Sequence, residues 1–461
     1  MLEVVGASLV GVLLARLYLN RRRGEGLRVW RTAADTAALT NIVVSEPPFS
    51  GLASLTGRAG PLTLRVDLLS GRVGQPRGTR LTVEVPGRTV SGVTLRAKGG
   101  DAAAETRGGR EIDSGDPAFD GEFDSGGNPA SVHAVLGAEA RAALLRLARS
   151  LGFRGGVSLV QGALRVEIPA ARTVAAIAVL PLLLEAARCL PDSLDMVEAL
   201  AANARTDPHP TVRLHNLRIL VREFGERSTT HESLRAATAD ASPEVRLCAA
   251  TALGEAGADI LLALAEGGAI DDACRAGAVD ALGPRLPRER LIAILETARR
   301  WRQVATAQSC LYRLGRAADG DALRLLVAVL DIEVSDLALA AVRALGVAGP
   351  AAEPSLLAAL HRGEPGVRFA VVEALGRAGT GASVPSLKDA AARHADDADF
   401  VAAVREAVAV IHLRIGGESR GGMSMAPVEH GQLSLADSES GRLSLPAEEP
   451  GRLSLRGEDD R

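Results

Sequence analysis

The chain has 461 residues, of which 47% are hydrophobic and 2% aromatic, and its formal net charge is −3. A net charge this close to zero provides no overall basic field, so we expect no nucleic-acid partner. The length predicts about two to four domains, and cores built from Leu, Val and Ala favour close-packed helices over aromatic-rich sheets.

Residues 1–23 are predicted to form a membrane anchor helix. The run from Val4 to Leu19 is almost wholly apolar, but its 16 residues give only about 24 Å of helix against a bilayer core of ~30 Å. Snorkelling side chains and local thinning of the bilayer can make up the difference. Three arginines, Arg21–Arg23, follow the run, and the positive-inside rule then places the bulk of the chain in the cytoplasm. A buried or amphipathic terminal helix is the alternative.

Residues 24–190 are predicted to form an α+β domain. Alternating apolar and polar residues indicate half-buried strands at Leu62–Leu69, Arg80–Val85 and Val93–Lys98. Val157–Pro169 is typical of two short strands in a hairpin around Gln161 and Gly162. Helices are expected at Ala138–Ser150, with Ala142, Leu145 and Ala148 near one face, and at Thr173–Cys189, bent or restarted at Pro181.

The segment "EIDSGDPAFDGEFDSGG", which begins at Glu111, contains the acids Asp113, Asp116, Asp120, Glu122 and Asp124. Their density would suit Ca²⁺, but their spacing does not fit an EF-hand loop. We therefore predict no metal site here, and expect Phe119 and Phe123 to anchor a turn while the acids are solvated. The wording "GDPAFDGEF" resembles a phrase of membrane-anchored bacterial domains, and this resemblance implies no activity.

The second half of the chain repeats a helical pattern. Aligned on the apolar residue before a glycine, the copies follow one another by 29, 32, 31 and 30 residues, at Leu253, Leu282, Leu314, Leu345 and Leu375. Leu220 extends the series backward, and residues 400–415 form a degenerate last copy. Other helical stretches lie between the copies. A fixed period with two helices per unit predicts an α-solenoid of about seven units, whose neighbours must stack to bury their apolar faces.

Caps and close contacts are also predicted within the units. Asp or Ser before the second helix of a unit is expected to cap its free N–H groups. Gly254, Gly346 and Gly376 are expected to end their helices in left-handed caps. Alanines such as Ala249 and Ala341 are expected to let the helices approach closely.

The units carry the pattern D-x-x-P-x-V-R followed by A-L-G, which is complete from Asp240 to Gly254 and partial in the copies at Asp207 and Pro365. The copy around Trp301 lacks the Asp and the Pro, and the copy at Asp331 lacks the Arg. This pattern resembles the HEAT-repeat family in its short bacterial form, over about residues 191–416. The resemblance implies an α-solenoid used for protein binding. It also implies that the Asp and Arg residues form a structural ladder, which makes scaffold residues of Arg213, Arg246, Arg275 and Arg368.

Residues 417–461 are predicted to be a disordered tail. It holds four ten-residue units: Gly421–His430 contains "GGMSM", and the three that follow, from Gly431, begin Gly-x-Leu-Ser-Leu. Each unit buries too little surface to fold alone. It could add as a strand to the edge of a partner's sheet, and four copies would raise avidity. An inert repeat left by DNA slippage is the alternative.

The predicted fold is therefore mainly α: a transmembrane helix (1–23), an α+β domain (24–190), a HEAT-like solenoid (191–416) and a tail (417–461). The four cysteines show no CxxC spacing and the eight histidines are scattered, so we expect buried free thiols, no cofactor and no enzymatic activity. The function predicted is a non-catalytic, membrane-tethered scaffold for protein partners. Some short HEAT proteins of this kind are bilin-chromophore lyases. An accessory subunit or lyase-like enzyme, with its site in the α+β domain, is therefore the alternative.

Overall fold

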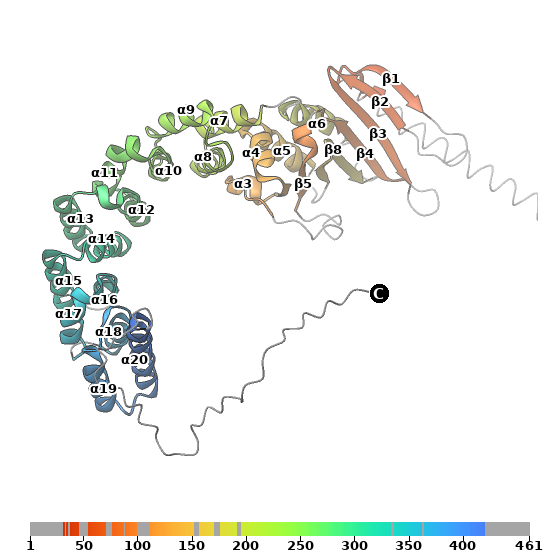
Figure 1. Ribbon diagram of the computed structural model, residues 1–461. Helices are drawn as coiled ribbons and strands as arrows, with labels where there is room; N and C mark the ends of the chain where they lie inside the picture. Colours follow the sequence, from red (N-terminus) through yellow and green to blue (C-terminus); the bar gives the residue numbers. More distant parts are fainter. Residues whose placement is uncertain are drawn as a thin grey trace, which may run out of the picture.

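A computed structural model shows a sheet-containing region at one end of a curved stack of helices (Figure 1). It describes residues 31–419, except 33, 36, 46–53, 71–75, 87, 99–110, 152–155, 170–175, 191–194, 333–335 and 362–363. The predicted anchor at 1–23 and the decapeptide units lie outside the described residues. The last helix runs to Ser419, just into the predicted tail.

The sheet has eight antiparallel strands in the order β1-β2-β3-β4-β8-β7-β5-β6. Their bounds are β1 Thr40–Ser45, β2 Ser54–Ala59, β3 Leu62–Ser70, β4 Pro76–Glu84, β5 Val93–Ala97, β6 Phe123–Gly127, β7 Val157–Val160 and β8 Ala163–Pro169. The structure has strands at the predicted positions and adds β1, β2 and β6. The predicted β7–β8 hairpin is present, because Gln161 (φ 52°) and Gly162 (φ 75°) adopt the positive φ that its two-residue turn needs.

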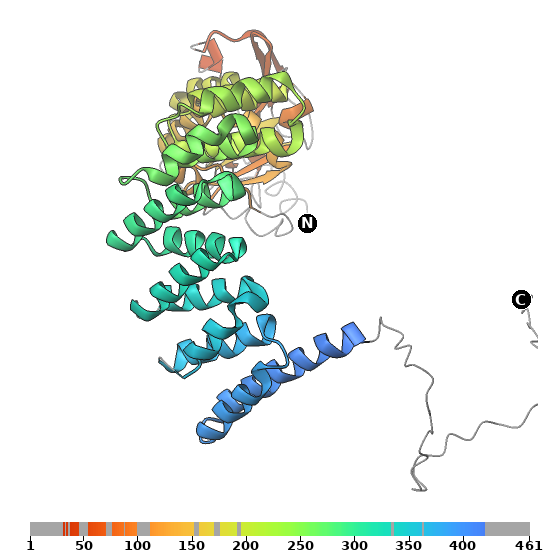
Figure 2. The same ribbon diagram turned by 60° about the vertical axis from the view of Figure 1, so that its left-hand side comes forward.

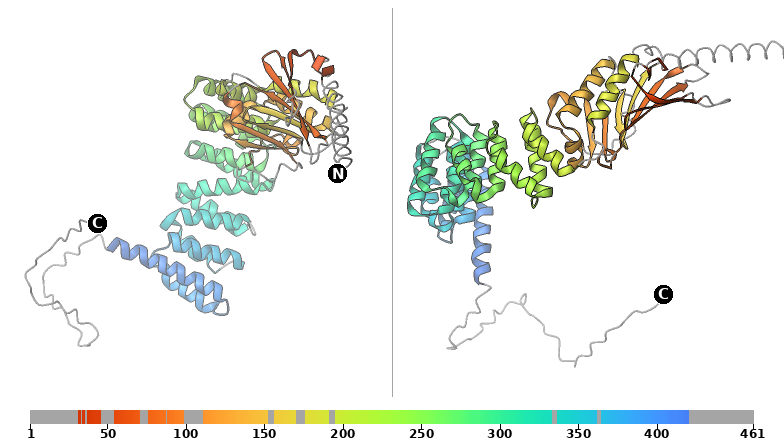
Figure 3. Two further views of the ribbon diagram at one scale, coloured as in Figure 1. Left: turned by 90° about the vertical axis from the view of Figure 1, so that its right-hand side faces the viewer. Right: turned by 90° about the horizontal axis from the view of Figure 1, so that it is seen from above.

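One face of the sheet is apolar and is covered by helices (Figure 3). Alternate residues of β3, such as Leu64 and Val66, are buried with the apolar sides of the helices. These helices are α2 Arg88–Ser91, α3 Pro117–Asp120, α4 Pro129–Val135, α5 Ala138–Leu151 and α6 Ala176–Cys189. Helix α6 continues through Pro181 without a break. The predicted face of α5 is partly correct: Leu145 is buried in the sheet core and Ala148 packs against it, but Ala142 is exposed. Ala143, Leu144 and Leu147 also fill the sheet core.

The remaining helices form seven consecutive pairs within the described residues, and Figures 1 and 2 show them stacked along an arc. The outer helices are α7 Met196–Thr206, α9 Ser228–Ala237, α11 Ala258–Glu266, α13 Arg288–Arg300, α15 Gly320–Ile332, α17 Glu353–Ala359 and α19 Ser383–Arg393. The inner helices are α8 Pro210–Phe224, α10 Pro243–Leu253, α12 Asp272–Leu282, α14 Val304–Ala317, α16 Asp336–Val347, α18 Pro365–Ala378 and α20 Ala398–Ser419. Short 3₁₀ turns lie at Gly254–Gly257 (η4), Gly283–Arg285 (η5) and Gly349–Ala352 (η6). The predicted helical solenoid is confirmed.

The glycine after the aligned leucine has two different roles. Gly254 and Gly283 end α10 and α12 with positive φ, at 63° and 57°. Gly346 and Gly376 lie inside α16 and α18, so the predicted left-handed caps there are wrong. A Cβ on Gly346 would lie 3.1 Å from the Cβ of Ala374 on the next inner helix, and a Cβ on Gly376 would lie 3.3 Å from the Cβ of Ala407. These glycines are needed because the next inner helix packs directly against them.

The caps expected before the inner helices are present in three units, since the Asp397 carboxylate accepts a hydrogen bond from the Phe400 amide at the start of α20. The Ser242 hydroxyl accepts a hydrogen bond from the Val245 amide at the start of α10. The Asp271 carboxylate accepts one from the Ala273 amide at the start of α12. Each side chain satisfies a backbone donor that has no partner inside its helix.

The first helix pair of the stack is joined to the sheet region by a buried ion-pair network, which we call the junction. Arg141 of α5 lies 2.9 Å from Asp207, at the end of α7, and 3.0 Å from Asp116, just before α3. Arg213 lies 2.7 Å from Asp240 of the next unit. Asp207 and Asp240 occupy equivalent positions in the repeat pattern. Arg141 therefore stands where the arginine of a preceding repeat would stand, and the sheet region covers the first end of the stack.

Among the described residues, one helical stretch, Pro243–Glu266, is long and apolar enough to cross a membrane by length and composition. It comprises α10, η4 and α11 of the solenoid. Leu261, Leu264 and Ala265 of this stretch belong to the core shared with the neighbouring helices.

Candidate functional site

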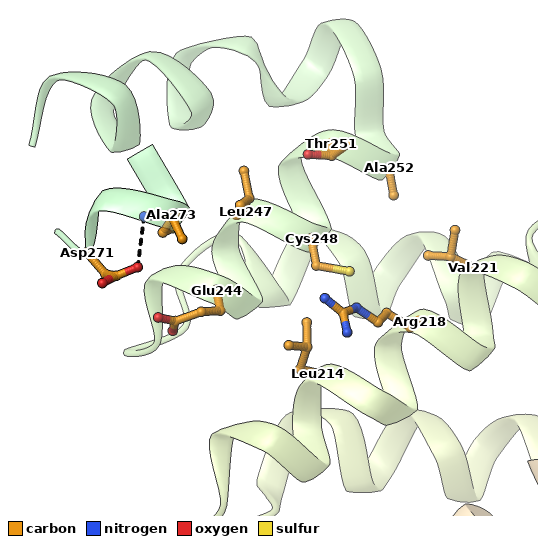
Figure 4. A pocket seen from close by; sticks show the side chains of 11 residues that line it. Leu214, Arg218, Val221, Glu244, Leu247, Cys248, Thr251, Ala252, Asp271 and Ala273 are labelled. Atoms are coloured by element: carbon orange, nitrogen blue, oxygen red, sulfur yellow. Dashed lines mark hydrogen bonds between the residues drawn. The ribbon is translucent and has the colours of Figure 1, made fainter. Parts of the chain in front are cut away.

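The inner face of the solenoid has a groove of about 490 Å³ between α8, α10 and α12 (Figure 4). We call it the inner groove. Its walls are mainly apolar, and it is lined by Leu214, Arg218, Val221, Glu244, Leu247, Cys248, Thr251, Ala252, Asp271, Ala273 and Cys274. A hollow with apolar walls and a few polar groups at its margins is a usual form of binding site.

The inner groove exists because the stack is looser here than further along. Gly315 of α14 packs directly against the backbone of Ala344, whereas nothing lies within 4 Å of a Cβ placed on Gly254 at the end of α10. On α12, Gly277 faces the Leu247 side chain of α10 rather than a small residue. The contact between α10 and α12 is accordingly less extensive than that between α14 and α16. Leu253 is only partly buried, although the equivalent Leu345 is fully buried.

The charged groups of the inner groove lie on different sides of it. Figure 4 shows Arg218 beside the Cys248 thiol, whereas Glu244 and Asp271 lie further along the groove. Glu244 accepts a hydrogen bond from Ser242, and Asp271 accepts one from the Ala273 amide. Arg218 makes no ion pair with a carboxylate among the described residues that surround it, so its guanidinium can contact a bound chain.

The two thiols of the inner groove are protonated at neutral pH. Burial raises the pKa of Cys248, although contact with Arg218 opposes this. Burial also raises the pKa of Cys274 to about 11. A nucleophilic cysteine needs a lowered pKa, so these thiols act as small apolar groups. All four cysteines are free.

The predicted ladder arginines do not reach the inner groove. Arg213 pairs with Asp240, Arg275 donates to Gln303, and Arg368 contacts His394, in each case in the next unit. Arg246 donates instead to the carbonyls of its own turn. The sequence did not predict the inner groove, because the contact between Leu247 and Gly277 becomes known only once the helices are placed.

The acidic segment lies at the junction, and only part of its prediction is correct. Phe119 and Phe123 are buried and stacked, with ring centroids 4.9 Å apart. Asp116 is not solvated: burial raises its pKa, but hydrogen bonds from Arg141 and the Phe119 amide outweigh this, and its pKa lies below the usual range. Asp116 is buried because it pairs with the buried Arg141, whereas Asp113, Glu122 and Asp124 are exposed as predicted.

Two further acids of this segment share a hydrogen bond beside a cavity of about 480 Å³. Burial and the contact with Asp113 raise the pKa of Asp120, while the same contact lowers that of Asp113. Among the described residues, no group of three or more His, Cys, Asp or Glu side chains is arranged to hold a metal ion.

Acidification should weaken the junction through His133 of α4. Burial, the neighbouring His215 and Arg141 lower the pKa of His133 to about 4. The unfolded chain therefore binds a proton near pH 6.5 that the folded chain does not bind until near pH 4, so stability falls as the pH falls through this window. We expect His133 to lower the free energy of unfolding by about 2 kcal/mol between pH 7 and pH 5.

Urea unfolding of the wild type and of His133→Gln at both pH values measures this effect. The wild type should lose more stability than the variant on acidification, because glutamine does not titrate. Equal losses in the two proteins would contradict the assignment to His133.

The fold defines this protein as an α-solenoid with a groove on its inner face. Residues 323–409 match the family model described as HEAT repeats, which confirms the resemblance seen in the sequence for this part of the stack. No curated protein matches the chain. Among solved structures, human deoxyhypusine hydroxylase in complex with glycerol is 19% identical. The alignment covers 47% of this chain and 96% of that chain, with a TM-score of 0.20.

The expectation that the chain has no enzymatic activity is corrected by this match. The solved structure that aligns with this chain is an enzyme, human deoxyhypusine hydroxylase. Helical repeats by themselves do not decide between catalytic and non-catalytic proteins, because a fold does not determine a function.

Proposed function

We propose that this chain is a membrane-tethered interaction protein whose solenoid binds a segment of a partner protein in the inner groove. The supporting observation is the hollow between α8, α10 and α12, in a stack whose later inner helices pack glycine directly against alanine. HEAT repeats form extended inner surfaces of the kind that bind other proteins.

The lining of the inner groove indicates the chemistry of the partner. Apolar side chains such as Leu214, Val221 and Leu247 would take apolar side chains of the partner. Arg218 would attract a carboxylate, and Glu244 on the far side would attract a basic group. An amphipathic helix that lays its apolar face into a groove has this arrangement, with its charges along the margins.

Filling the inner groove tests the proposal. Ala252 is exposed at the margin of the inner groove, and Ala263 is exposed on the outer helix α11. We expect Ala252→Arg to weaken capture of partner proteins by the tagged full-length chain at least tenfold, because the longer side chain occupies the hollow. Ala263→Arg is the matched control and should capture partners as the wild type does. Equal capture by both variants would place binding elsewhere.

The membrane tether rests on the apolar run from Val4 to Leu19 and the arginines that follow it. With this orientation the solenoid would face cytoplasmic partners. Extraction of membranes with carbonate tests the tether, and protease treatment of intact cells tests the orientation. Release of all the protein by carbonate would refute the first, and digestion of the solenoid from outside would refute the second.

A further inference from the structure

The last repeat of the solenoid carries a second groove, of about 520 Å³, between α19 and α20. We call it the terminal groove. Valines of α20, namely Val401, Val404 and Val408, form one wall, and alanines of α19, such as Ala391, contribute to the other. In the preceding repeats the equivalent surface is covered by the next helix pair, but no described residue follows α20 along the stack (Figure 2). A stack of repeats needs a cap at such an end.

We propose that the terminal groove is covered by the Gly-x-Leu-Ser-Leu units of this chain's own tail. Each of the last three units would bring two leucines, such as Leu443 and Leu445, to the same side of an extended segment, which suits a groove with apolar walls. The two charged residues that line the groove, Lys388 and Arg405, are both basic. The segments that follow the leucine pairs, "ADSES", "PAEEP" and "RGEDD", are predominantly acidic, while Arg442 and Arg452 precede two of the pairs. Residues 431–460 hold seven acids and three arginines, so their net negative charge favours a groove with a basic lining.

The length of the tail decides which units can reach the groove. Val404 in the terminal groove precedes Ser419, the end of α20, by 15 residues, which is about 22 Å along the helix. An extended tail therefore needs about seven residues to run back from Ser419 to the groove. Met423 and Met425 follow Ser419 too closely to return that far. Leu433 follows it by 14 residues and can reach, as can the two later leucine pairs. The unit that carries Met in place of Leu is thus the one that acts as a connector.

A second copy of the chain fits the terminal groove less well. A two-fold contact between two such ends would bring Lys388 and Arg405 of one copy against the same basic residues of the other. A head-to-tail contact is blocked, because the first end of the stack is covered through Arg141 and Asp207. Three leucine units attached nearby supply an effective concentration of about millimolar, so even a weak unit occupies the groove.

A labelled peptide of residues 441–450 tests the proposal by fluorescence anisotropy. We expect it to bind a chain that lacks residues 421–461, and to bind the full-length chain at least fivefold more weakly, because the attached units compete. A peptide with Leu443→Ser and Leu445→Ser should bind at least tenfold more weakly than the native peptide.

Two exposed alanines provide the matched variants of the shortened chain. Ala392 lines the terminal groove, and Ala409 lies on α20 outside the residues that line it. Ala392→Glu should weaken peptide binding at least fivefold and Ala409→Glu should not, with circular dichroism showing that both fold. The proposal would be overturned if the peptide failed to bind the shortened chain, or bound the shortened and full-length chains equally. Equal binding by the two alanine variants would also overturn it. Sedimentation showing that the shortened chain dimerises through Ala392 would also overturn it, in favour of a second copy.

Discussion

Arg141→Met should cost the protein about 3–5 kcal/mol of stability, because it leaves two buried carboxylates without their cation. The side chains of Arg141, Asp116 and Asp207 are 2%, 8% and 0% exposed, so water cannot replace the lost partner. Arg141 also donates to the Leu136 carbonyl at the end of α4. The change should lower the urea concentration at which the full-length chain unfolds, as followed by circular dichroism.

Arg213→Met is the matched control for this prediction. Its pair with Asp240 has the same place in the ladder, but the two side chains are 12% and 11% exposed. Partial access to water should reduce the loss to less than half of that caused by Arg141→Met. Adding Asp207→Asn to Arg141→Met should recover part of the stability by removing one unpaired charge. Equal losses of stability in Arg141→Met and Arg213→Met would show that the junction contributes no more than an ordinary Arg–Asp pair between two repeats.

Gly315→Ala should destabilise the solenoid by about 2–3 kcal/mol, near the upper end for overpacked sites. The added Cβ would collide with the Ala344 carbonyl oxygen, which belongs to the backbone of the next inner helix and cannot rotate away. The two inner helices would have to separate. Thermal unfolding followed by circular dichroism measures the loss.

Gly366→Ala provides the control, since it makes the same change in the first turn of α18, where nothing lies within 4 Å of the added Cβ. Alanine has the higher helix propensity, so this variant should be as stable as the wild type or more stable by up to about 1 kcal/mol. Loss of stability in both variants would mean that the close approach at Gly315 is not the cause.

The helical half of the fold could be predicted because its signal is periodic. Leucines at a fixed step, together with the turn prolines, identify helix pairs before any contact is known. The sequence could not predict whether the glycine after the aligned leucine ends its helix or lies inside it, because this depends on the next helix. Gly376 meets the small residue Ala407, whereas a Cβ on Gly283 would meet the Arg313 guanidinium. The same local sequence therefore ends one helix and lies inside another.

The junction and the inner groove could not be predicted from the sequence. Arg141 and Asp207 are 66 residues apart. Arg141 is one of many arginines in the sequence, and nothing in the pattern of its helix indicates that its side chain is buried. The sequence shows the acids around Asp116, but it does not show that Arg141 pairs with Asp116. The inner groove depends on how far apart α10 and α12 lie. That spacing follows from one leucine, Leu247, at a contact with Gly277, and such a detail has no periodic signature.

The junction has a consequence for synthesis on the ribosome. Chains emerge N-terminus first, at about 5–20 residues per second, and domains fold as units. Arg141 and Asp116 therefore leave the ribosome before Asp207, and the sheet region can present a finished surface to the first helix pair as it appears. Each later pair then meets a folded predecessor, so the stack grows in one direction. A nascent chain stalled partway would be a shorter solenoid with an open end, rather than a collapsed intermediate.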